Sequence, residues 1–185
     1  MSRGLGDVYK RQTMDGITMP LNDKLVVKFA FEHDLKNIVL ALDSVKTSDN
    51  FTFSSPLAYN AIPDLLQLRS SVFELGKIYF LLLDDTETIR GIAEFETSAI
   101  SRYITNSVAI LSYVSCPSKN LDEFVKGCAS LINKVALCRT TKIRTYIPVD
   151  QPEAIESFSH SGFEKAAFLK EEYGKIDVCM MDYFV

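Results

Sequence analysis

The run Val108-Ala-Ile-Leu-Ser-Tyr-Val-Ser115, which Cys116-Pro117 ends, decides the fold because an ordered series of elements follows it. The run is largely apolar, which is typical of a buried strand. Asn120 then stands where a helix N-cap is expected, and Glu123 lies three residues later. This capping-box arrangement predicts that a helix begins directly after the turn.

The predicted helix is long and has one apolar face. Its apolar residues recur at spacings of three and four, as an eighteen-residue amphipathic helix requires. They are Leu121, Phe124, Val125, Cys128, Ala129, Ile132, Val135 and Ala136. The alternating run Lys142 to Ile147 predicts a strand, Glu153 to His160 predicts a shorter helix, and the segment closes on Ser161-Gly162-Phe163.

This order of elements and the Gly162-Phe163 ending resemble the GNAT superfamily of acyl-CoA N-acyltransferases, over residues 24–185. Two pieces, Lys165–Leu169 and Asp177–Met181, fit the final hairpin of family members. The resemblance implies one α/β (α+β) domain over residues 13–185, with a mixed, mostly antiparallel central sheet flanked by about four helices. The alternative is a different α/β fold.

The resemblance also implies acetyl-CoA as the co-substrate. The strand at Val114, Ser115 and Cys116 would hydrogen-bond the pantetheine arm. Lys119, with the backbone of Lys119, Asn120 and Leu121, would hold the pyrophosphate at the start of the helix, where the helix dipole favours an anion. No metal is implied.

The family's pyrophosphate loop reads Gln/Arg-x-x-Gly-x-Gly/Ala, and its three defined positions fall on Lys119, Asp122 and Phe124. The basic residue is kept and both small residues are lost. A carboxylate about 5 Å from a phosphate costs on the order of 3 kcal/mol at an effective dielectric near 20. A second alignment places the loop on Gly127-Cys128-Ala129, which interrupts the apolar face of the helix.

The family's general-acid Tyr falls on Phe158, which has no proton to donate, and its helix-starting Asn falls on Gln151. His160 lies two residues further along and projects from a different helix face. It is either a partly exposed polar residue or a catalytic one.

The N-terminal half predicts the rest of the fold. We expect a strand at 24–30, a helix at 32–42, an irregular connection at 43–61, a helix at 63–73 and a hairpin of strands 77–83 and 89–97. The helix at 32–42 should turn Leu35, Ile38, Val39 and Leu42 inward. The connection carries Phe51, Phe53 and Tyr59, which either line an amine pocket or pin the connection to the core.

Alternation after Gly91 puts Glu94 and Glu96 on one face of the second hairpin strand. In the family this strand runs beside the strand that carries the acyl carbonyl. Either carboxylate could therefore accept the proton of an attacking ammonium, directly or through water. The alternative is that both are solvated surface residues.

The run Ser2 to Gln12 resembles one reading frame of a transposase-based sequencing-library adapter, so we expect it to be foreign and the gene to come from assembled environmental DNA. Native sequence is expected from Thr13 on, with Met14, Met19 or a lost upstream codon as the start. The whole chain has 20 basic and 24 acidic residues, and this run holds three of the basic and one of the acidic residues. The rest of the chain therefore has an excess of six acidic residues.

An acidic domain gives no electrostatic reason to bind nucleic acid or an anionic membrane, and it favours a cationic amine, of a small molecule or a peptide. Cys116, Cys128, Cys138 and Cys179 lack metal-site spacing, and reduced thiols point to the cytoplasm. A homodimer is compatible with the sequence.

The sequence leaves two candidate functions. One is an N-acyltransferase that works by direct attack of the amine, and the other is a GNAT-fold binding or regulatory module with weakened catalysis.

Overall fold

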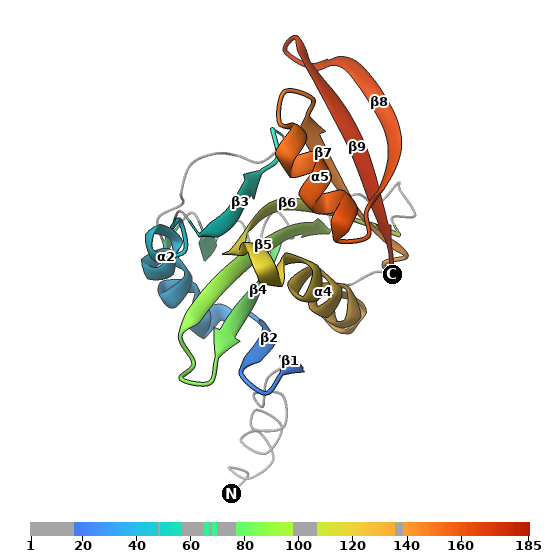
Figure 1. Cartoon of the computed structure of the whole chain (residues 1–185). Helices are drawn as coiled ribbons and strands as arrows, with labels where there is room; N and C mark the ends of the chain where they lie inside the picture. The colour runs from blue at the N-terminus through green and yellow to red at the C-terminus, as the bar shows by residue number, and fades with distance from the viewer. Residues whose placement is uncertain are drawn as a thin grey trace, which may run out of the picture.

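Figure 1 shows the computed structural model of the chain, which describes residues 17–47, 49–56, 65–66, 68–69, 77–97, 107–135 and 139–185. Within them nine strands form one sheet in the order β1-β2-β4-β5-β6-β7-β9-β8, and β3 pairs with β6 off this path. The strands are β1 Thr18–Asn22, β2 Leu25–Phe29, β3 Asn50–Ser54, β4 Lys77–Asp84, β5 Ile89–Thr97, β6 Val108–Pro117, β7 Lys142–Pro148, β8 Glu164–Tyr173 and β9 Ile176–Phe184. Among the described strands, β6 and β7 alone pair in parallel.

The helices complete the expected fold class. They are the 3₁₀ turns η1 Glu32–Asp34 and η2 Ser118–Asn120 and the α-helices α2 Leu35–Ser44, α4 Leu121–Val135 and α5 Pro152–His160. The helix predicted at 63–73 lies mostly outside the described residues, of which 65, 66, 68 and 69 are helical. The mixed, mostly antiparallel sheet with its flanking helices confirms the predicted fold class.

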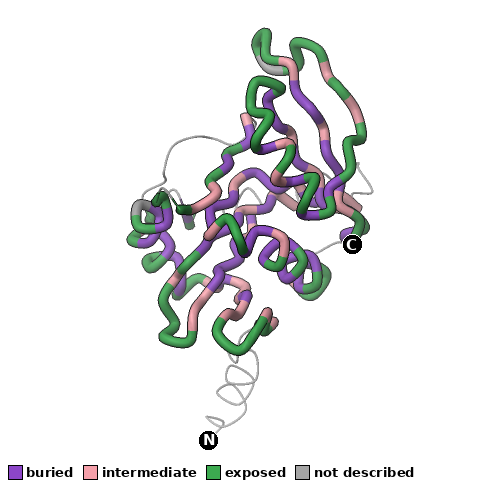
Figure 2. The backbone as a smooth tube through the Cα atoms, in the orientation of Figure 1, coloured by how far each residue is buried: buried purple, intermediate pink, exposed green. Residues whose placement is uncertain are grey.

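The sheet separates two apolar cores, and the buried stretches of backbone run through the middle of the molecule (Figure 2). On one face α4 and α5 pack through Phe124, Ile132 and Phe158. On the other face α2 packs through Leu35 and Ile38. The apolar faces predicted for the two longer helices are therefore confirmed, except that Ala136 lies outside the described residues.

The Gly162-Phe163 ending is the C-terminal cap of α5. Gly162 has a left-handed backbone, with φ of 88°, which glycine adopts without steric cost. Its N–H donates to Ser159 O at 3.1 Å, and the N–H of Phe163 donates to Phe158 O at 3.0 Å. These two bonds form a Schellman motif, and the Phe158 and Phe163 rings make the apolar contact that accompanies it.

Two strands were not predicted. β1 precedes the first expected strand and pairs with β2, and β3 lies inside the segment expected to be irregular.

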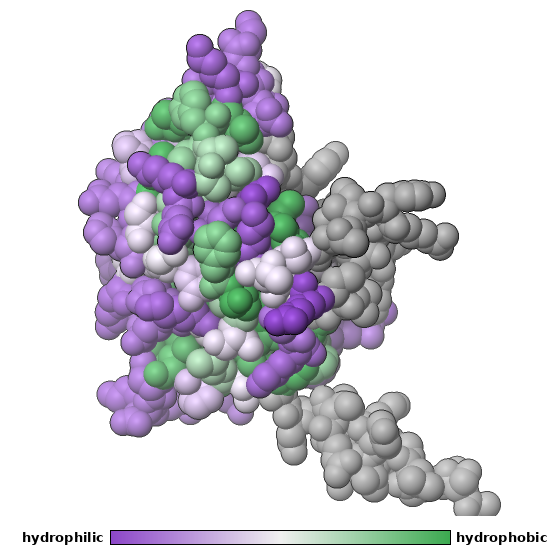
Figure 3. Space-filling view, turned by 90° about the vertical axis from the view of Figure 1, so that its right-hand side faces the viewer, coloured by the Kyte–Doolittle hydropathy of each residue, from purple (hydrophilic) through white to green (hydrophobic). Residues whose placement is uncertain are grey.

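At the edge of the sheet opposite β1, β8 and β9 form a long projecting hairpin (Figure 1) that exposes Phe168, Ile176 and Phe184. Figure 3 shows this side of the molecule, where the hydrophilic tip of the hairpin stands above apolar surface.

Candidate functional site

The site begins where β6 and β7 separate. The two parallel strands pair over three residues each, Val108–Ile110 with Lys142–Arg144. Beyond them β6 continues beside β5, and β7 continues beside β9. The strands thus leave a wedge between their C-terminal halves, and α4 and α5 each follow the C-terminal end of one of these strands (Figure 1).

The chain's own strand β3 fills this wedge. β3 pairs antiparallel with β6 in the register Phe51↔Cys116, Thr52↔Ser115 and Phe53↔Val114. The other edge of the same stretch of β6 pairs with β5. Both edges of the predicted pantetheine strand, Val114 to Cys116, are therefore occupied, and all three residues are fully buried.

The bonds at the two ends of β3 show which backbone groups face β6. Ser55 N donates to Ser112 O at 2.8 Å, and Ser118 N donates to Asp49 O at 3.4 Å. Both bonds belong to the β3–β6 register, in which hydrogen-bonded and non-hydrogen-bonded pairs alternate. The backbones of Phe51 and Phe53 therefore face β6, and the backbone of Thr52 faces away.

Side chains fasten β3 at its start. Asn50 Nδ2 donates to Val45 O at 2.6 Å, and Ser115 Oγ donates to the same carbonyl at 2.9 Å. Because the Ser115 hydroxyl proton is used there, Thr52 Oγ1 donates to Ser115 Oγ, at 2.8 Å. At the far end Ser55 Oγ donates to Tyr146 O on β7 at 3.3 Å, so the segment spans the wedge.

An aromatic cluster holds β3 from the side of α5. The ring of Phe158 lies 5.5 Å from Phe51, 5.1 Å from Phe53 and 5.1 Å from Phe163, each centre to centre and edge to face. Such pairs contribute about 0.5–1.5 kcal/mol beyond area burial. Phe51 and Phe53 therefore pin the connection to the core, and Phe51 also lines a surface groove. Tyr59 lies outside the described residues.

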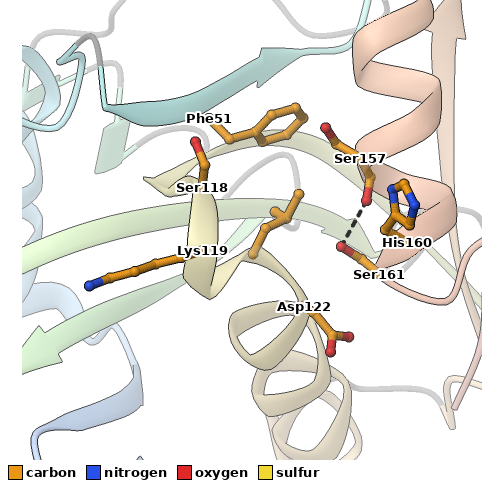
Figure 4. Close-up of a pocket in the computed structure, with 8 residues that line it drawn as sticks. Phe51, Ser118, Lys119, Asp122, Ser157, His160 and Ser161 are labelled. Carbon is orange, nitrogen blue, oxygen red and sulfur yellow. Dashed lines mark hydrogen bonds between the residues drawn. The ribbon is translucent and has the colours of Figure 1, made fainter.

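A groove remains at the mouth of the wedge (Figure 4). One part, of about 250 Å³, is lined by Phe51, Ser118, Lys119, Leu121, Asp122, Ser157, His160 and Ser161. It adjoins a second part of about 610 Å³ between β3 and the start of α5, since Phe51, Ser118 and Ser157 line both. The ammonium of Lys119 points away from the groove, whereas Asp122 lies on the groove side of α4 (Figure 4). Asn120, in η2, is buried.

Asp122 brings negative charge to the first turn of α4. One carboxylate oxygen accepts from Lys126 Nζ at 2.8 Å, and the other is buried and has no hydrogen-bond partner among the described residues. The Lys126 ammonium offsets part of the charge, and the side chains of both residues are about half exposed. A phosphate at this turn would meet the helix dipole and also this carboxylate.

The second loop alignment is wrong. Gly127 lies in the middle of α4, and its buried position is where the helix packs on the sheet. A Cβ there would lie 2.6 Å from Val27 Cγ2 and 2.9 Å from Leu21 Cδ2. The missing side chain allows close helix–sheet contact and does not form a phosphate loop.

The predicted carboxylates lie on the face that α2 covers, in different surroundings. Glu94 accepts three hydrogen bonds, from Lys77 Nζ at 2.8 Å, Tyr79 Oη at 2.5 Å and Ser112 Oγ at 2.7 Å. Glu96 lies 3.5 Å from Lys77 Nζ, and its side chain is 35% exposed against 13% for Glu94. Burial, with the Glu94 carboxylate beside it, raises the pKa of Tyr79 far above its usual value, so the phenol stays protonated and donates.

Ser112 connects this cluster to the wedge. It is the extra residue at an irregularity between Glu94 and Phe95 in the β5–β6 pairing. Ser112 O accepts from β3, while its hydroxyl reaches Glu94. Tyr113 pairs directly opposite Glu94, and its hydroxyl is buried. His160 is exposed and lines the mouth groove, away from this cluster.

Sequence reasoning missed Lys77, Tyr79 and Ser112. Lys77 is a buried cation at the start of an apolar strand, and Ser112 is a buried hydroxyl within another. A lone polar residue in an apolar run signals a buried partner, but it does not say which residue that partner is.

The described cysteines are free and buried. They are Cys116, Cys128 and Cys179, and Cys138 lies outside the described residues. Burial raises the pKa of the Cys116 thiol to about 12. Among the residues described, no three His, Cys, Asp or Glu side chains are grouped to hold a metal ion. No helix in the same residues is long and apolar enough to cross a membrane.

Comparison with profiles of known protein families finds no match, and neither does comparison with curated proteins. Solved structures do match. A dodecameric spermidine N-acetyltransferase from Vibrio cholerae aligns with 88% of this chain and 95% of its own, at a TM-score of 0.58 and 16% identity. The spermidine/spermine N-acetyltransferase SpeG of the same organism, in complex with manganese ions, aligns with 89% and 95%, at 0.56 and 18%. At this identity the likeness shows the GNAT fold.

Proposed function

We propose that the protein is an N-acyltransferase that moves an acetyl or other acyl group from CoA to an amine. The observation that carries the proposal is the separation of the parallel strands β6 and β7 directly before the first turns of α4 and α5. The wedge suits an extended amide-bearing arm, and the mouth groove at the start of α4 suits a pyrophosphate. The similar fold of the Vibrio cholerae spermidine N-acetyltransferase structures supports the same assignment.

The cofactor residues keep the roles that the resemblance implies. Val114, Ser115 and Cys116 would hold the pantetheine arm, and the backbone of Lys119, Asn120 and Leu121 would hold the pyrophosphate. Since Lys119 directs its ammonium away from the groove, its backbone carries the larger part of that role (Figure 4). The residues fit CoA only when β3 is out of the wedge.

Glu94 is the general base in this proposal. Of the two carboxylates it is the one that touches Ser112, at the point where β6 leaves its pairing with β7. It takes a proton from the ammonium, directly or through one water. The amine nitrogen then attacks the acyl carbon, the C–N bond forms and the C–S bond breaks. The thiolate leaves and takes up the second nitrogen proton, which yields an amide, free CoA and one proton on Glu94.

Direct attack is favoured over a covalent acyl-enzyme. The nearest described thiol, Cys116, is buried, and its raised pKa keeps it protonated and weakly nucleophilic at neutral pH. Burial also raises the pKa of Tyr79, so its phenol stays protonated and donates its hydrogen bond to Glu94. The acceptor is a small-molecule or peptide amine, which suits the acidic composition of the chain.

A binding or regulatory module is the second candidate, and one observation favours it. β3 saturates the edge of β6 that the cofactor would use, and Phe158 packs on β3 where family members place a Tyr. In such a module the wedge would stay closed and no acyl transfer would occur.

Thermal shift assays with acetyl-CoA, free CoA and ADP distinguish the two candidates. A ligand that binds only the folded state raises the melting temperature, and at equal concentration a tighter ligand raises it more. For the enzyme we expect the largest rise with acetyl-CoA, because the wedge and the mouth are both used. An equal rise with ADP and acetyl-CoA would mean that only the mouth binds, and no rise with any ligand would contradict the acyltransferase.

A further inference from the structure

We infer that β3 is an internal strand that competes with acyl-CoA for one edge of β6, so that the wedge opens only when β3 unpairs. This inference rests on the proposed function and adds a way in which acyl-CoA binding would be regulated. The chain would then carry an autoinhibitory segment built into the connection after α2.

The course of β3 through the wedge is the first reason. Asn50 pairs with Pro117 at the mouth, and Ser54 pairs with Tyr113 at the deep end. Between them β3 offers backbone amides to Val114 and Cys116, the groups that the proposed function assigns to the pantetheine arm. A strand and an amide-bearing arm that bind the same edge cannot be present together.

The second reason is that the rest of the fold does not depend on β3. The eight other strands form a continuous path, and β3 pairs only with β6 beside that path. Its residues Thr52 and Ser54 are exposed, and Phe51 is only partly buried. Unpairing β3 would therefore leave every other strand pair in place.

The hold on β3 is nevertheless specific. Phe53 is only 2% exposed, and its ring packs on Phe158. Asn50 and Ser115 both donate a hydrogen bond to the carbonyl of Val45. When the binding-competent form is a minor fraction, the apparent dissociation constant is the intrinsic one divided by that fraction. Each tenfold weakening of the β3 contacts should therefore tighten acyl-CoA binding about tenfold, until the open form dominates.

A reversible lock tests the competition. Ser54 and Tyr113 form a non-hydrogen-bonded antiparallel pair, whose Cα atoms lie about 4.5 Å apart, within the range of disulfides. Neither residue is assigned to the cofactor. We would measure acetyl-CoA binding by calorimetry on the double variant Ser54→Cys/Tyr113→Cys, oxidised and then reduced. Oxidation should weaken binding at least tenfold, and reduction should restore it. The single variant Ser54→Cys, treated in the same way, should show no such change.

A release variant tests the opposite direction. Phe51→Ala removes a partly buried ring that contacts Phe158, and we expect acetyl-CoA to bind at least tenfold tighter. Phe29→Ala is the matched control, since Phe29 is also partly buried against the same core but lies in β2. It should lower the melting temperature without tightening binding.

The outcomes separate the inference from the proposed function. If the oxidised double variant binds acetyl-CoA as well as the reduced one, β3 does not compete, and the inference fails while the acyltransferase stands. If neither the reduced variant nor Phe51→Ala binds acetyl-CoA, the proposed function fails and the inference falls with it. Tighter binding by Phe29→Ala equal to that of Phe51→Ala would also overturn the inference.

Discussion

Glu94 is the residue on which the proposed chemistry depends most. Three donors fix its carboxylate beside Ser112, while Glu96 is more exposed and His160 lines the mouth groove, away from this cluster. We expect Glu94→Gln to lower kcat/KM by about 10² to 10⁴, the usual contribution of a general base. Glu96→Gln and His160→Ala should each change it less than about tenfold. Steady-state rates from pH 6 to 9 check this, with melting temperatures to show that each variant is folded. Full activity in Glu94→Gln would overturn the assignment of Glu94, and full activity in both Glu→Gln variants would exclude either carboxylate as the general base.

Asp122 should weaken CoA binding, because its carboxylate lies where a phosphate is expected and one of its oxygens has no hydrogen-bond partner in the described part of the chain. Asp122→Asn should tighten acetyl-CoA binding by about tenfold, or ~1.4 kcal/mol. This is less than the unscreened estimate because Lys126 and solvent offset the charge. Asp122→Gly should act in the same direction. Glu123→Gln, an exposed charge in the same turn, is the control for calorimetric titration. A pyrophosphate site elsewhere would be indicated if the Asp122 variants bound no tighter than Glu123→Gln.

At the scale of elements, Asp182 joins β9 to β7. It is 3% exposed and accepts from Arg144 Nε at 2.7 Å and Lys142 Nζ at 2.9 Å. Removing one partner of such a buried pair costs about 3–5 kcal/mol, so Asp182→Asn should lower the free energy of unfolding by about 3 kcal/mol at pH 7. Glu164→Gln, an exposed carboxylate paired opposite in β8, should change it little. Urea unfolding measures both.

The same pair predicts a pH dependence. The hydrogen bonds from Arg144 and Lys142 lower the pKa of Asp182 in the folded state. A lowered pKa means that the stabilisation is complete above the unfolded value of about 3.9 and is lost as pH falls through the folded value. The difference between wild type and Asp182→Asn should therefore be constant from pH 5 to 7 and smaller at pH 3. An undiminished difference at pH 3 would contradict the ion pair.

Elements with a long, regular pattern were predictable, and those made by pairing were not. α4 followed from its apolar periodicity, and the ending of α5 followed from Gly162-Phe163. β3 alternates over only five residues among Ser, Thr and Asn, and its partner β6 is more than fifty residues away. The contacts of Glu94 arise from the register of three strands and the irregularity at Ser112, which no local pattern encodes.

For the whole molecule, the foreign origin of residues 1–12 remains a prediction, and these residues lie outside the described part. Because no selection shaped an adapter-derived run to fit this fold, a chain that begins at Thr13 should melt at the same temperature as the full chain. Differential scanning calorimetry on both proteins checks this. A clear loss of stability on deletion would show that the run belongs to the native domain.

The central claim is that this chain transfers an acyl group from CoA to an amine. The most direct measurement is amine-dependent release of free CoA thiol from acetyl-CoA, with polyamine, amino-sugar and peptide acceptors and with mass spectrometry of the product. We predict thiol release with at least one acceptor, an acetylated product in equal amount, and a faster rate for Phe51→Ala than for wild type at limiting acetyl-CoA. If neither protein released thiol above the amine-free rate with any acceptor, the GNAT fold would serve binding here and the acyltransferase would be wrong.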